Sequence, residues 1–591
     1  MIYPKLKKYL LLFLLLTCTT ILAEESFAQI LAPDREFRAT WLTTTWGLDW
    51  PNSSHLPKQQ QLALLEILDR HVEQGLNAVI FQVSARGDAL YKSKTLPWAY
   101  VLTGRPGVDP GWDPLAFAIR ESHKRGLELH AWFNVFSIAY NTDSDSPPDA
   151  NQPNIRYAHP EWVSSVVINE DVEHLWLNPG IPEAREWQVQ NVMEMVENYD
   201  VDAVHFDRIR YFSGGYDNDS ELFEQYNPEG LTDIDDWRRH NVTELVREAS
   251  VRIQDLKPWV KIGAAVSGHY NKDSSDGWPA RYGYGEVFAD SRLWAERGYV
   301  DYLSPMNYWD ISSPPRFDFI AEDWAAHSNG NYAVYMGAAP YKQSVFKELH
   351  LQIDVTRTHD IAGQVHYRYS HVSEISDHYS GRYDHISLIS PMAGKSQTPP
   401  PMVQNVELSI QQDSLSISWE ADGIQNEPVT RNKFAVYCSA CGPDRTRQRL
   451  SVTGTTTLKL PITLWPDGER ASIEVTSLNR NYIESAPFEQ TLIITNEEIA
   501  PELADRIELH QNYPNPFNPT TQISFDVSQT GRITLTVYDM TGRMVAKLMD
   551  KTVPSGFHHV TFDGGGLSSG IYLYRLQTDS KTITKKMTLI K

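Results

Sequence analysis

Eight apolar, strand-like segments recur through the first 400 residues, and they constrain the fold more than any other feature of the chain. They cover residues 38–46, 78–83, 127–136, 201–211, 260–266, 300–309, 332–338 and 363–369. Amphipathic stretches with helical spacing of apolar residues lie between several of them, as at 59–74 and 183–199. Strands and helices alternating in this number predict a (β/α)8 barrel with insertions. The alternative is an open doubly wound sheet, but no glycine-rich phosphate loop follows the first segment.

The residues after the barrel predict two small all-β units, because 591 residues exceed what one hydrophobic core usually serves. Three prolines at 399–401 mark a linker at 396–402. Residues 403–497 contain alternating strands such as 415–419, and with Trp419 they resemble a fibronectin type III module, although Ala471 stands where that family usually has tyrosine. The predicted fold is multidomain: a TIM barrel at 30–395, followed by two small all-β sandwich domains.

The first 28 residues predict a cleaved export signal. Lys5, Lys7 and Lys8 precede an apolar run at 9–16, and small residues continue to Ala23 or Ala28. This run is shorter than the roughly 18 to 20 residues that span a bilayer, and no second candidate follows. We therefore expect no transmembrane helix in the mature chain.

Charge and aromatic content narrow the class of partner. The net charge of −22 repels phosphate backbones and anionic lipid, so we expect no nucleic-acid partner. Of 17 Trp residues, 15 precede residue 400, which concentrates indole rings in the predicted barrel. The mature chain has one cysteine pair, Cys438 and Cys441, which predicts a local disulfide or two free thiols. No cluster has metal-ligand spacing, so neither a metal nor another cofactor is expected.

The end of the fourth segment, residues 201–211, is the richest in chemistry. Strand alternation places His205 and Asp207 on one face. A charged aspartate at the mouth of a packed barrel is costly unless it is paired, and Arg208 or Arg210 could pair with it. An ion pair that only closes the barrel is the structural alternative to a catalytic carboxylate.

Other segment ends add polar and aromatic groups that together predict a Trp-lined cleft. Indole faces stack on sugar rings, while amides and carboxylates bind sugar hydroxyls. Taken singly, each residue also has a structural explanation, for example that Asp88 and Asp310 cap helices. The predicted substrate-binding residues are Arg38, Trp46, Trp50, Asp88, His130, Trp132, Asn134, His205, Asn307, Tyr308 and Trp309.

Several motifs resemble the glycosyl hydrolase-like 10 (DUF187) family over about residues 30 to 395. They are EFRATWL at 36–42, WGLDWP at 46–51, Gln82 with GDALY at 87–91, Asp207, and SPMNYW at 304–309. The resemblance implies a TIM barrel that acts on glycosidic bonds, with members directed at peptidoglycan strands stripped of their peptides. Family members often have two consecutive aspartates after the fourth strand, whereas here Arg208 follows Asp207.

The last segment, at 505–591, resembles the type A C-terminal sorting domain of the type IX secretion system. The motifs are NYPNPFNPTT at 512–521, YDMTG at 538–542 and GIYLY at 570–574. The resemblance implies a Gram-negative relative of the Bacteroidota that exports this protein across its outer membrane, to the cell surface or the medium. The type IX secretion machinery is then a partner.

The sequence thus predicts an exported glycoside hydrolase acting on a polysaccharide, and the resemblance implies peptide-free peptidoglycan as that polysaccharide. Glycoside hydrolysis ordinarily uses two carboxyl groups. Asp207 is the first choice and Asp310, after the sixth segment, the second, with Asp88 and Glu286 as alternatives. The rival hypothesis is a surface carbohydrate-binding or adhesion protein that keeps the barrel but has no turnover. The sequence leaves open the linkage, the anomeric outcome and the oligomeric state.

Overall fold

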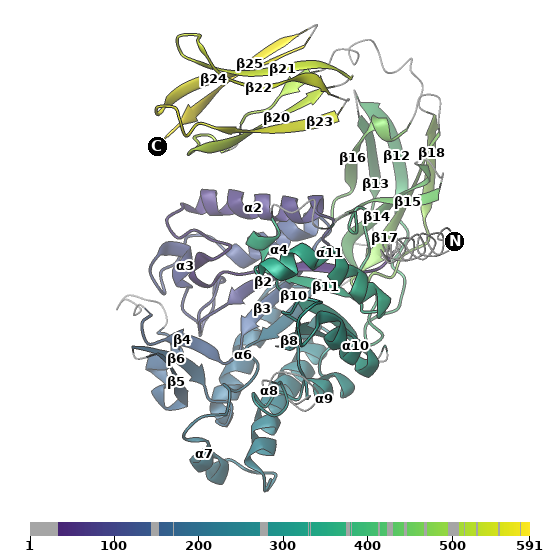
Figure 1. Ribbon diagram of the computed structural model, residues 1–591. Coiled ribbons are helices and arrows are strands. Elements are labelled where there is room, and N and C mark those ends of the chain that lie inside the picture. Colours follow the sequence, from purple (N-terminus) through teal and green to yellow (C-terminus); the bar gives the residue numbers. More distant parts are fainter. Residues whose placement is uncertain are drawn as a thin grey trace, which may run out of the picture.

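The computed structural model shows a barrel followed by two β-sandwiches (Figure 1). It describes residues 33–143, 153–169, 171–271, 282–328, 330, 332–373, 379, 381–411, 414–421, 430–441, 446–465, 470–493, 507–512, 514–527, 530–553, 556–578 and 581–590. The export signal expected at 1–28 lies outside the described residues.

Eight parallel strands close into the barrel, which confirms the predicted fold class. In spatial order they are β1 (Phe37–Leu42), β11 (Gly363–Tyr367), β10 (Ala333–Ala338), β9 (Tyr302–Met306), β8 (Lys261–Ser267), β7 (Ala203–Asp207), β3 (Glu128–Asn134) and β2 (Ala78–Ser84). Because every pairing around the ring is parallel, the carboxyl ends of all eight strands meet at one mouth.

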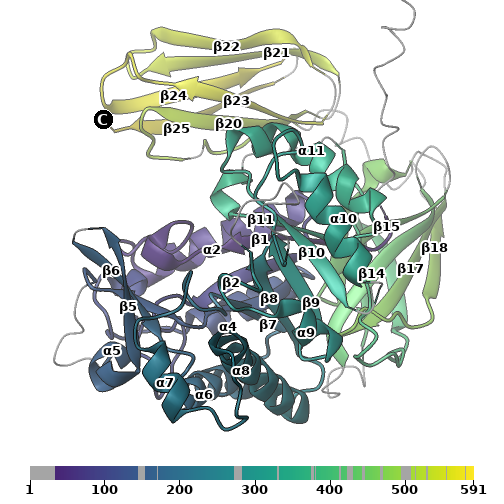
Figure 2. The same ribbon diagram turned by 60° about the horizontal axis from the view of Figure 1, so that its bottom comes forward.

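Helices surround the barrel (Figure 2). The longer helices are α2 (Pro57–Glu73), α4 (Pro114–Lys124), α6 (Pro182–Asn198), α8 (Ile234–Leu256), α10 (Phe317–Ser328) and α11 (Gln343–Thr358). Proline occupies the first turn of α2, α4 and α6, where its missing N–H costs nothing. The side chains of Asp113 and Asp233 accept backbone N–H bonds at the starts of α4 and α8. The shorter ones are α3 (Tyr100–Thr103), α5 (Ile155–Ala158), α7 (Asp219–Gln225) and α9 (Ser291–Glu296). Among the described residues, β11 is followed only by a 3-10 turn at Tyr369–His371, so the expected eighth helix is not seen there.

An inserted sheet stands beside the mouth, and the sequence did not predict it. It consists of β4 (Ser137–Tyr140), β6 (Val172–Leu177) and β5 (Val163–Asn169), in that order (Figure 1). The link from β3 to β4 is bonded to the end of β7, because Val135 N–H donates to the Asp207 carbonyl at 2.8 Å. The insertion is therefore anchored next to the strand end that the sequence marks as reactive.

The middle sandwich, residues 404–493, contains two antiparallel sheets. One sheet orders β12 (Gln404–Gln411), β13 (Ser414–Glu420) and β16 (Thr457–Pro461); the other orders β15 (Thr446–Thr453), β14 (Thr430–Cys441), β17 (Arg470–Asn479) and β18 (Phe488–Ile493). Cys438 is disulfide-bonded, in agreement with the first of the two alternatives for the cysteine pair. The resemblance to fibronectin type III stays a prediction.

The middle sandwich closes the amino-terminal end of the barrel. A Cβ atom added to Gly126 would lie 2.4 Å from the Val452 carbonyl oxygen, and one added to Gly454 would lie 2.0 Å from the His123 carbonyl oxygen. Only glycine permits this approach of the two backbones. Tyr437 and Tyr482 belong to the same buried cluster as the barrel interior. The sandwich and the barrel therefore share a core.

The C-terminal sandwich, residues 507–590, also contains two sheets. The first orders β19 (Ile507–Leu509), β20 (Thr520–Val527) and β23 (Gly556–Asp563); the second orders β22 (Met544–Val553), β21 (Gly531–Asp539), β24 (Gly570–Gln577) and β25 (Thr582–Leu589). The outward positions of β22 and β25 carry charged and polar side chains, which dilute the apolar alternation of these two strands. Within the described residues, no helix combines the length and apolar character that crossing a bilayer requires.

Candidate active site

Asp207 ends β7 at the mouth of the barrel, with its side chain 14% exposed. Its Oδ1 accepts a hydrogen bond from the Arg208 backbone N–H at 2.6 Å, and Arg210 Nη1 lies 3.9 Å from the same oxygen. Asn134, the last residue of β3, is its register partner on the neighbouring strand. Arg208 has a φ of 53°, a left-handed conformation that is uncommon for a residue with a side chain and that turns the chain at this carboxylate.

Tyrosines stand on the other side of Asp207. Tyr308 follows β9 and Tyr367 ends β11, and their rings stack with centroids 5.9 Å apart. Burial raises the pKa of Tyr308 well above its usual value, and the nearby Tyr367 and Asp207 add to this. Both phenols therefore stay protonated at neutral pH and offer hydroxyl groups beside the carboxylate. Trp41, whose ring is 6.1 Å from that of Tyr367, lies below them.

A chain of hydrogen bonds runs down the barrel axis beneath the mouth. Trp41 Nε1–H donates to His205 Nε2 at 3.1 Å, and since this nitrogen accepts, the ring proton of His205 is on Nδ1. His205 Nδ1–H then donates to the Tyr302 hydroxyl at 3.0 Å. Burial lowers the pKa of His205 well below its usual value, with a smaller effect from His130 in the same direction, which agrees with a neutral ring.

The chain continues to a buried charge. The Tyr302 hydroxyl donates to His130 Nδ1 at 2.7 Å, and His130 Nε2–H donates to Glu128 at 2.9 Å. Lys261 Nζ donates to the other oxygen of Glu128 at 2.6 Å. The indole donor at one end and the carboxylate at the other thus fix the direction of every bond in the chain.

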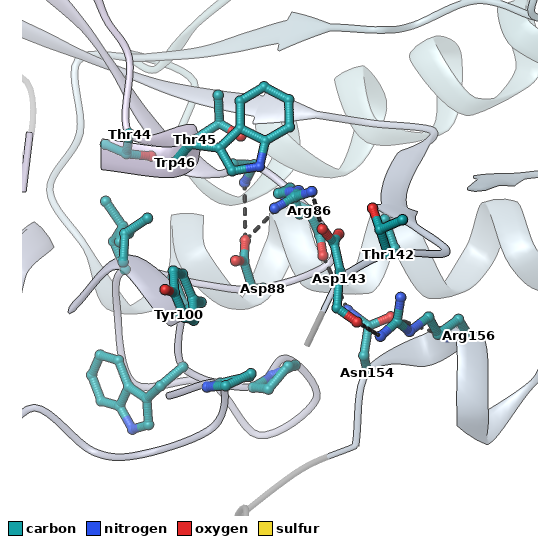
Figure 3. A pocket seen from close by; sticks show the side chains of 18 residues that line it. Thr44, Thr45, Trp46, Arg86, Asp88, Tyr100, Thr142, Asp143, Asn154 and Arg156 are labelled. Atoms are coloured by element: carbon teal, nitrogen blue, oxygen red, sulfur yellow. Dashed lines mark hydrogen bonds and ion pairs between the residues drawn. The ribbon is translucent and has the colours of Figure 1, made fainter. Parts of the chain in front are cut away.

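A second feature of the rim is a cavity of about 300 Å³ beside the ends of β1 and β2 (Figure 3). Trp46 is 57% exposed above it, and the Arg86 guanidinium lies 4.7 Å from its ring centroid. Arg86 is ion-paired with Asp143, which the insertion supplies. Burial raises the pKa of Asp88, and hydrogen bonds from the backbone N–H groups of Arg86 and Ala85 offset this only in part.

The cavity and the carboxylate belong to one rim. Asn134 Nδ2 donates to the Ala85 carbonyl at 2.9 Å, which ties the register partner of Asp207 to the cavity wall. Trp132 Nε1–H in turn donates to Asn134 Oδ1 at 3.0 Å. Of the predicted residues, the structure brings together Asp207, Asn134 and Tyr308 at the mouth, with Trp132 beneath them and Trp46 and Asp88 at the cavity.

The structure places four other predicted residues away from the mouth. Arg38 faces outward at the amino-terminal part of β1, fully buried, and its Nε donates to Glu36 at 2.7 Å. Trp50 is 2% exposed and packs outside the barrel wall, with Nε1–H donating to the Gln60 carbonyl at 2.9 Å. His130 and His205 face inward, as alternation predicts, but both lie buried in the axial chain. Facing the barrel interior or following a strand is not sufficient for reaching the rim, so these four side chains lie outside the cleft that the sequence predicts them to line.

The predicted residues that follow β9 lie in different surroundings. Asn307 is fully buried and its Nδ2 donates to the Phe317 carbonyl at 2.9 Å, so it holds the start of α10. Trp309 is half-buried with its ring 5.8 Å from that of His269. Asp310 Oδ1 accepts from Ser313 N–H at 2.7 Å and from the Ser312 hydroxyl at 3.0 Å. Burial alone would raise the pKa of Asp310, but these hydrogen bonds outweigh it and the pKa is lowered.

Sequence reasoning missed two residues of the rim. Tyr367 ends the eighth strand, so the strand-end rule that selected Asp207 could have found it. Asp143 carries no sequence signal, because only the placement of the insertion brings it to Arg86. Within the described part of the chain, no group of three or more His, Cys, Asp or Glu side chains could hold a metal ion.

Comparison with known proteins agrees with this architecture. The family model for glycosyl hydrolase-like 10 matches residues 36–350, which is more than half of the chain. The chain belongs to the glycosyl hydrolase-like 10 family. The family match covers all the barrel strands except β11, together with Asp207 and the cavity residues. A model of the secretion system C-terminal sorting domain matches residues 511–591, so the protein is exported by type IX secretion to the cell surface or the medium.

Two curated relatives share the barrel region. The chain is 38% identical over 320 residues to glycosyl hydrolase YngK of Bacillus subtilis (strain 168), covering 52% of this chain and 61% of that protein, less than two thirds of its length. It is 37% identical over 327 residues to glycosyl hydrolase DigH of Escherichia coli (strain K12), covering 52% and 73%. Among solved structures, the PgaB (BpsB) glycoside hydrolase domain from Bordetella bronchiseptica aligns with 12% identity over 60% of this chain and 99% of that chain, at a TM-score of 0.42. At that score the likeness supports no further conclusion.

Proposed function

We propose that this protein is an exported glycoside hydrolase that cleaves O-glycosidic bonds in a polysaccharide. The observation that carries the proposal is Asp207, a partly exposed carboxylate at the barrel mouth, with paired tyrosines on one side and an aromatic cavity on the other. Membership of the glycosyl hydrolase-like 10 family supports the same reaction class. Peptide-free peptidoglycan strands are the proposed substrate, because the resemblance to the family implies them.

Asp207 is proposed as one of the two reacting carboxyl groups. Arg210 at 3.9 Å and the Arg208 N–H at 2.6 Å orient it, and Tyr308 and Tyr367 offer hydroxyls to the sugar. We propose Asp310 as the second carboxyl group, since it follows β9 on the same rim and its lowered pKa keeps it ionised, as a base or nucleophile requires. Asp88, with its raised pKa, is the alternative that suits a general acid.

The test compares purified wild-type protein with Asp207→Asn, Asp310→Asn and Asp88→Asn on peptide-free glycan strands. Released reducing ends measure hydrolysis, and the denaturation midpoint shows that each variant is folded. We expect Asp207→Asn and Asp310→Asn each to lower kcat/KM by roughly 100-fold or more, as loss of a reacting acid or base does. Full activity in Asp310→Asn together with loss in Asp88→Asn would transfer the second role to Asp88.

The rival function, a carbohydrate-binding protein without turnover, predicts a different outcome. Wild type and Asp207→Asn would then bind the glycan equally and neither would release sugar. Detection of sugar release by wild type alone excludes this rival.

A further inference from the structure

The cavity beside β1 and β2 has a composition that neither the family match nor the relatives explain. One wall is apolar and consists of Leu90, Pro97, Trp98, Ala99, Val101 and Pro106. The opposite wall is polar and includes Asp88 and Thr142. A cavity of about 300 Å³ is at the small end of ligand sites, so it suits a single ring with a short substituent.

Charges in the cavity are compensated within the protein. Arg86 is paired with Asp143, and Arg156 donates from Nη1 to the Tyr140 carbonyl at 2.7 Å and from Nη2 to the Asp143 carbonyl at 3.0 Å. With Asp88 in its ionised form, the cavity contains two arginines and two aspartates, so its formal charge balances. A ligand group that carries its own charge would enter without a counter-ion, and burying it would be costly. The cavity therefore favours an uncharged ligand.

Trp46 supplies a platform of the kind that sugar rings use. Its indole lies on the Arg86 guanidinium at 4.7 Å and next to the Tyr140 ring at 5.7 Å, yet 57% of the residue is exposed. The contacts from Arg86 and Tyr140 fix the ring in place while leaving area for a ligand. In Figure 3 Trp46 lies above Asp88, and Tyr100 and Thr142 lie on opposite sides of that carboxylate.

We propose that this cavity is a sugar subsite that selects an uncharged 2-acetamido sugar of the glycan, next to the sugar held at Asp207. The proposal rests on the proposed function, because it gives one residue of the same polymer a place on the same rim. The pyranose ring stacks on Trp46, the amide N–H donates to Asp88, and the acetamido methyl group packs against the apolar wall around Ala99. A plain hexose lacks this methyl group, and a sugar acid brings an uncompensated charge.

The insertion that contains this sheet supplies part of the wall of the proposed subsite. Thr142 and Asp143 directly follow β4, and Asn154 and Arg156 lie at α5, so this wall of the cavity comes from the insertion. Asn154 Nδ2 donates to the Arg86 carbonyl at 3.0 Å, which joins the two walls. The barrel supplies the reacting group, and the insertion supplies the choice of neighbouring sugar.

The binding experiment uses the full chain carrying Asp207→Asn, titrated calorimetrically with three probes. They are tri-N-acetylchitotriose, cellotriose, which has no acetamido groups, and trigalacturonate, which is anionic. We expect chitotriose to bind at least tenfold more tightly than either of the others. Equal binding of cellotriose or trigalacturonate would overturn the proposal.

Three substitutions added to this chain locate the binding. Trp46→Gly removes the indole, and glycine suits the φ of 53° at this position. Thr142→Trp fills the cavity from an exposed position, so it does not disturb the core. We expect each to weaken chitotriose binding at least tenfold, with an unchanged denaturation midpoint. Phe319→Ala is the matched control, because Phe319 is also an exposed aromatic residue under an arginine, with Arg316 at 4.4 Å, and it lies outside the cavity.

The outcomes separate this proposal from the proposed function. Chitotriose binding that depends on Trp46 and Thr142, in a protein whose wild type cleaves no glycan, would overturn hydrolysis and keep the subsite. Glycan hydrolysis by wild type, combined with unchanged chitotriose binding in Trp46→Gly and Thr142→Trp, would overturn the subsite and keep the enzyme. Binding lost equally in Phe319→Ala would also overturn the subsite.

Discussion

The two ends of the barrel use charged residues in opposite ways. At the amino-terminal end, Glu128 is fully buried and bonded to Lys261 and His130, and the middle sandwich adds Lys433 at 4.0 Å. At the mouth, Asp207 remains partly exposed, and its nearest guanidinium nitrogen is 3.9 Å away. Breaking a buried, fully bonded pair costs folding free energy, whereas a looser, wetter pair leaves its carboxylate accessible to a substrate. We therefore expect substitutions at the first end to change stability and substitutions at the mouth to change activity.

Removing the middle sandwich is expected to have the largest effect. Tyr437, Leu478 and Tyr482 of the middle sandwich complete a buried cluster at the end of the barrel, and a chain ending at residue 402 lacks them. Burial of these three side chains stabilises the fold by about 5 kcal/mol or more in total. A chain ending at residue 497 loses the C-terminal sandwich but keeps this core, and it serves as the control. Urea denaturation of both measures the difference. Equal midpoints would show that the barrel end closes by itself.

The second prediction contrasts Glu128→Gln with Asp207→Asn. Glu128→Gln leaves Lys261 buried without its counter-charge, so the free energy of unfolding should fall by about 3 to 5 kcal/mol while kcat of the folded protein is kept. Asp207→Asn should change the free energy of unfolding by less than about 1 kcal/mol and lower kcat/KM by roughly 100-fold or more. Denaturation curves and turnover on the same samples test both. A stable Glu128→Gln, or an unstable Asp207→Asn, would contradict the assignment of roles to the two ends.

Two buried histidines, His71 on α2 and His366 on β11, should make the stability of the protein fall as the pH is lowered. Burial lowers the pKa of His71 to about 4, although the hydrogen bond of its ring to the Ile67 carbonyl has a smaller, opposite effect. Burial also lowers the pKa of His366 to about 3. Below pH 6.5 the unfolded chain binds protons that the folded chain excludes, so stability is present above this pH and is lost as pH falls toward these values. In the limit, the lowered pKa corresponds to about 3 kcal/mol for His71 and about 5 kcal/mol for His366.

Urea denaturation at pH 7, 6 and 5 checks this prediction. The window lies above the pKa of free carboxyl groups, so histidines dominate the change. His366→Asn, which keeps a neutral polar side chain on β11, should reduce the slope. A stability that is constant from pH 7 to 5 would contradict the neutral, buried state of these rings.

Tyr308→Phe is expected to have the smallest effect. It removes one hydroxyl beside Asp207 and keeps the ring stacked on Tyr367. The free energy of unfolding should change by less than about 0.5 kcal/mol, as at other sites where no buried bond is lost. We expect kcat/KM to fall about tenfold, because the variant loses one good hydrogen bond to the substrate. An activity equal to wild type would remove this hydroxyl from the substrate contacts.

The sequence by itself determined the barrel and predicted that Asp207 stands at its mouth. Strand and helix periodicity is local, so all eight strands were predicted close to their observed positions. Alternation within 201–211 also placed Asp207 correctly on the inward face. For His205, alternation gave the correct face of the strand but not the depth of the side chain along the barrel axis. His205 precedes Asp207 by only two residues, yet its side chain lies in the closed interior below the mouth.

Only the tertiary structure decided what surrounds that carboxylate. Arg38 belongs to β1 and Trp50 follows that strand, yet both side chains pack outside the wall. Tyr367 and Asp143, which are far apart in the chain, reach the rim. These positions depend on the register around the closed ring and on where the insertion docks, and both are set by long-range packing that no local pattern encodes. The same packing turned a segment that reads as an independent sandwich into the floor of the barrel.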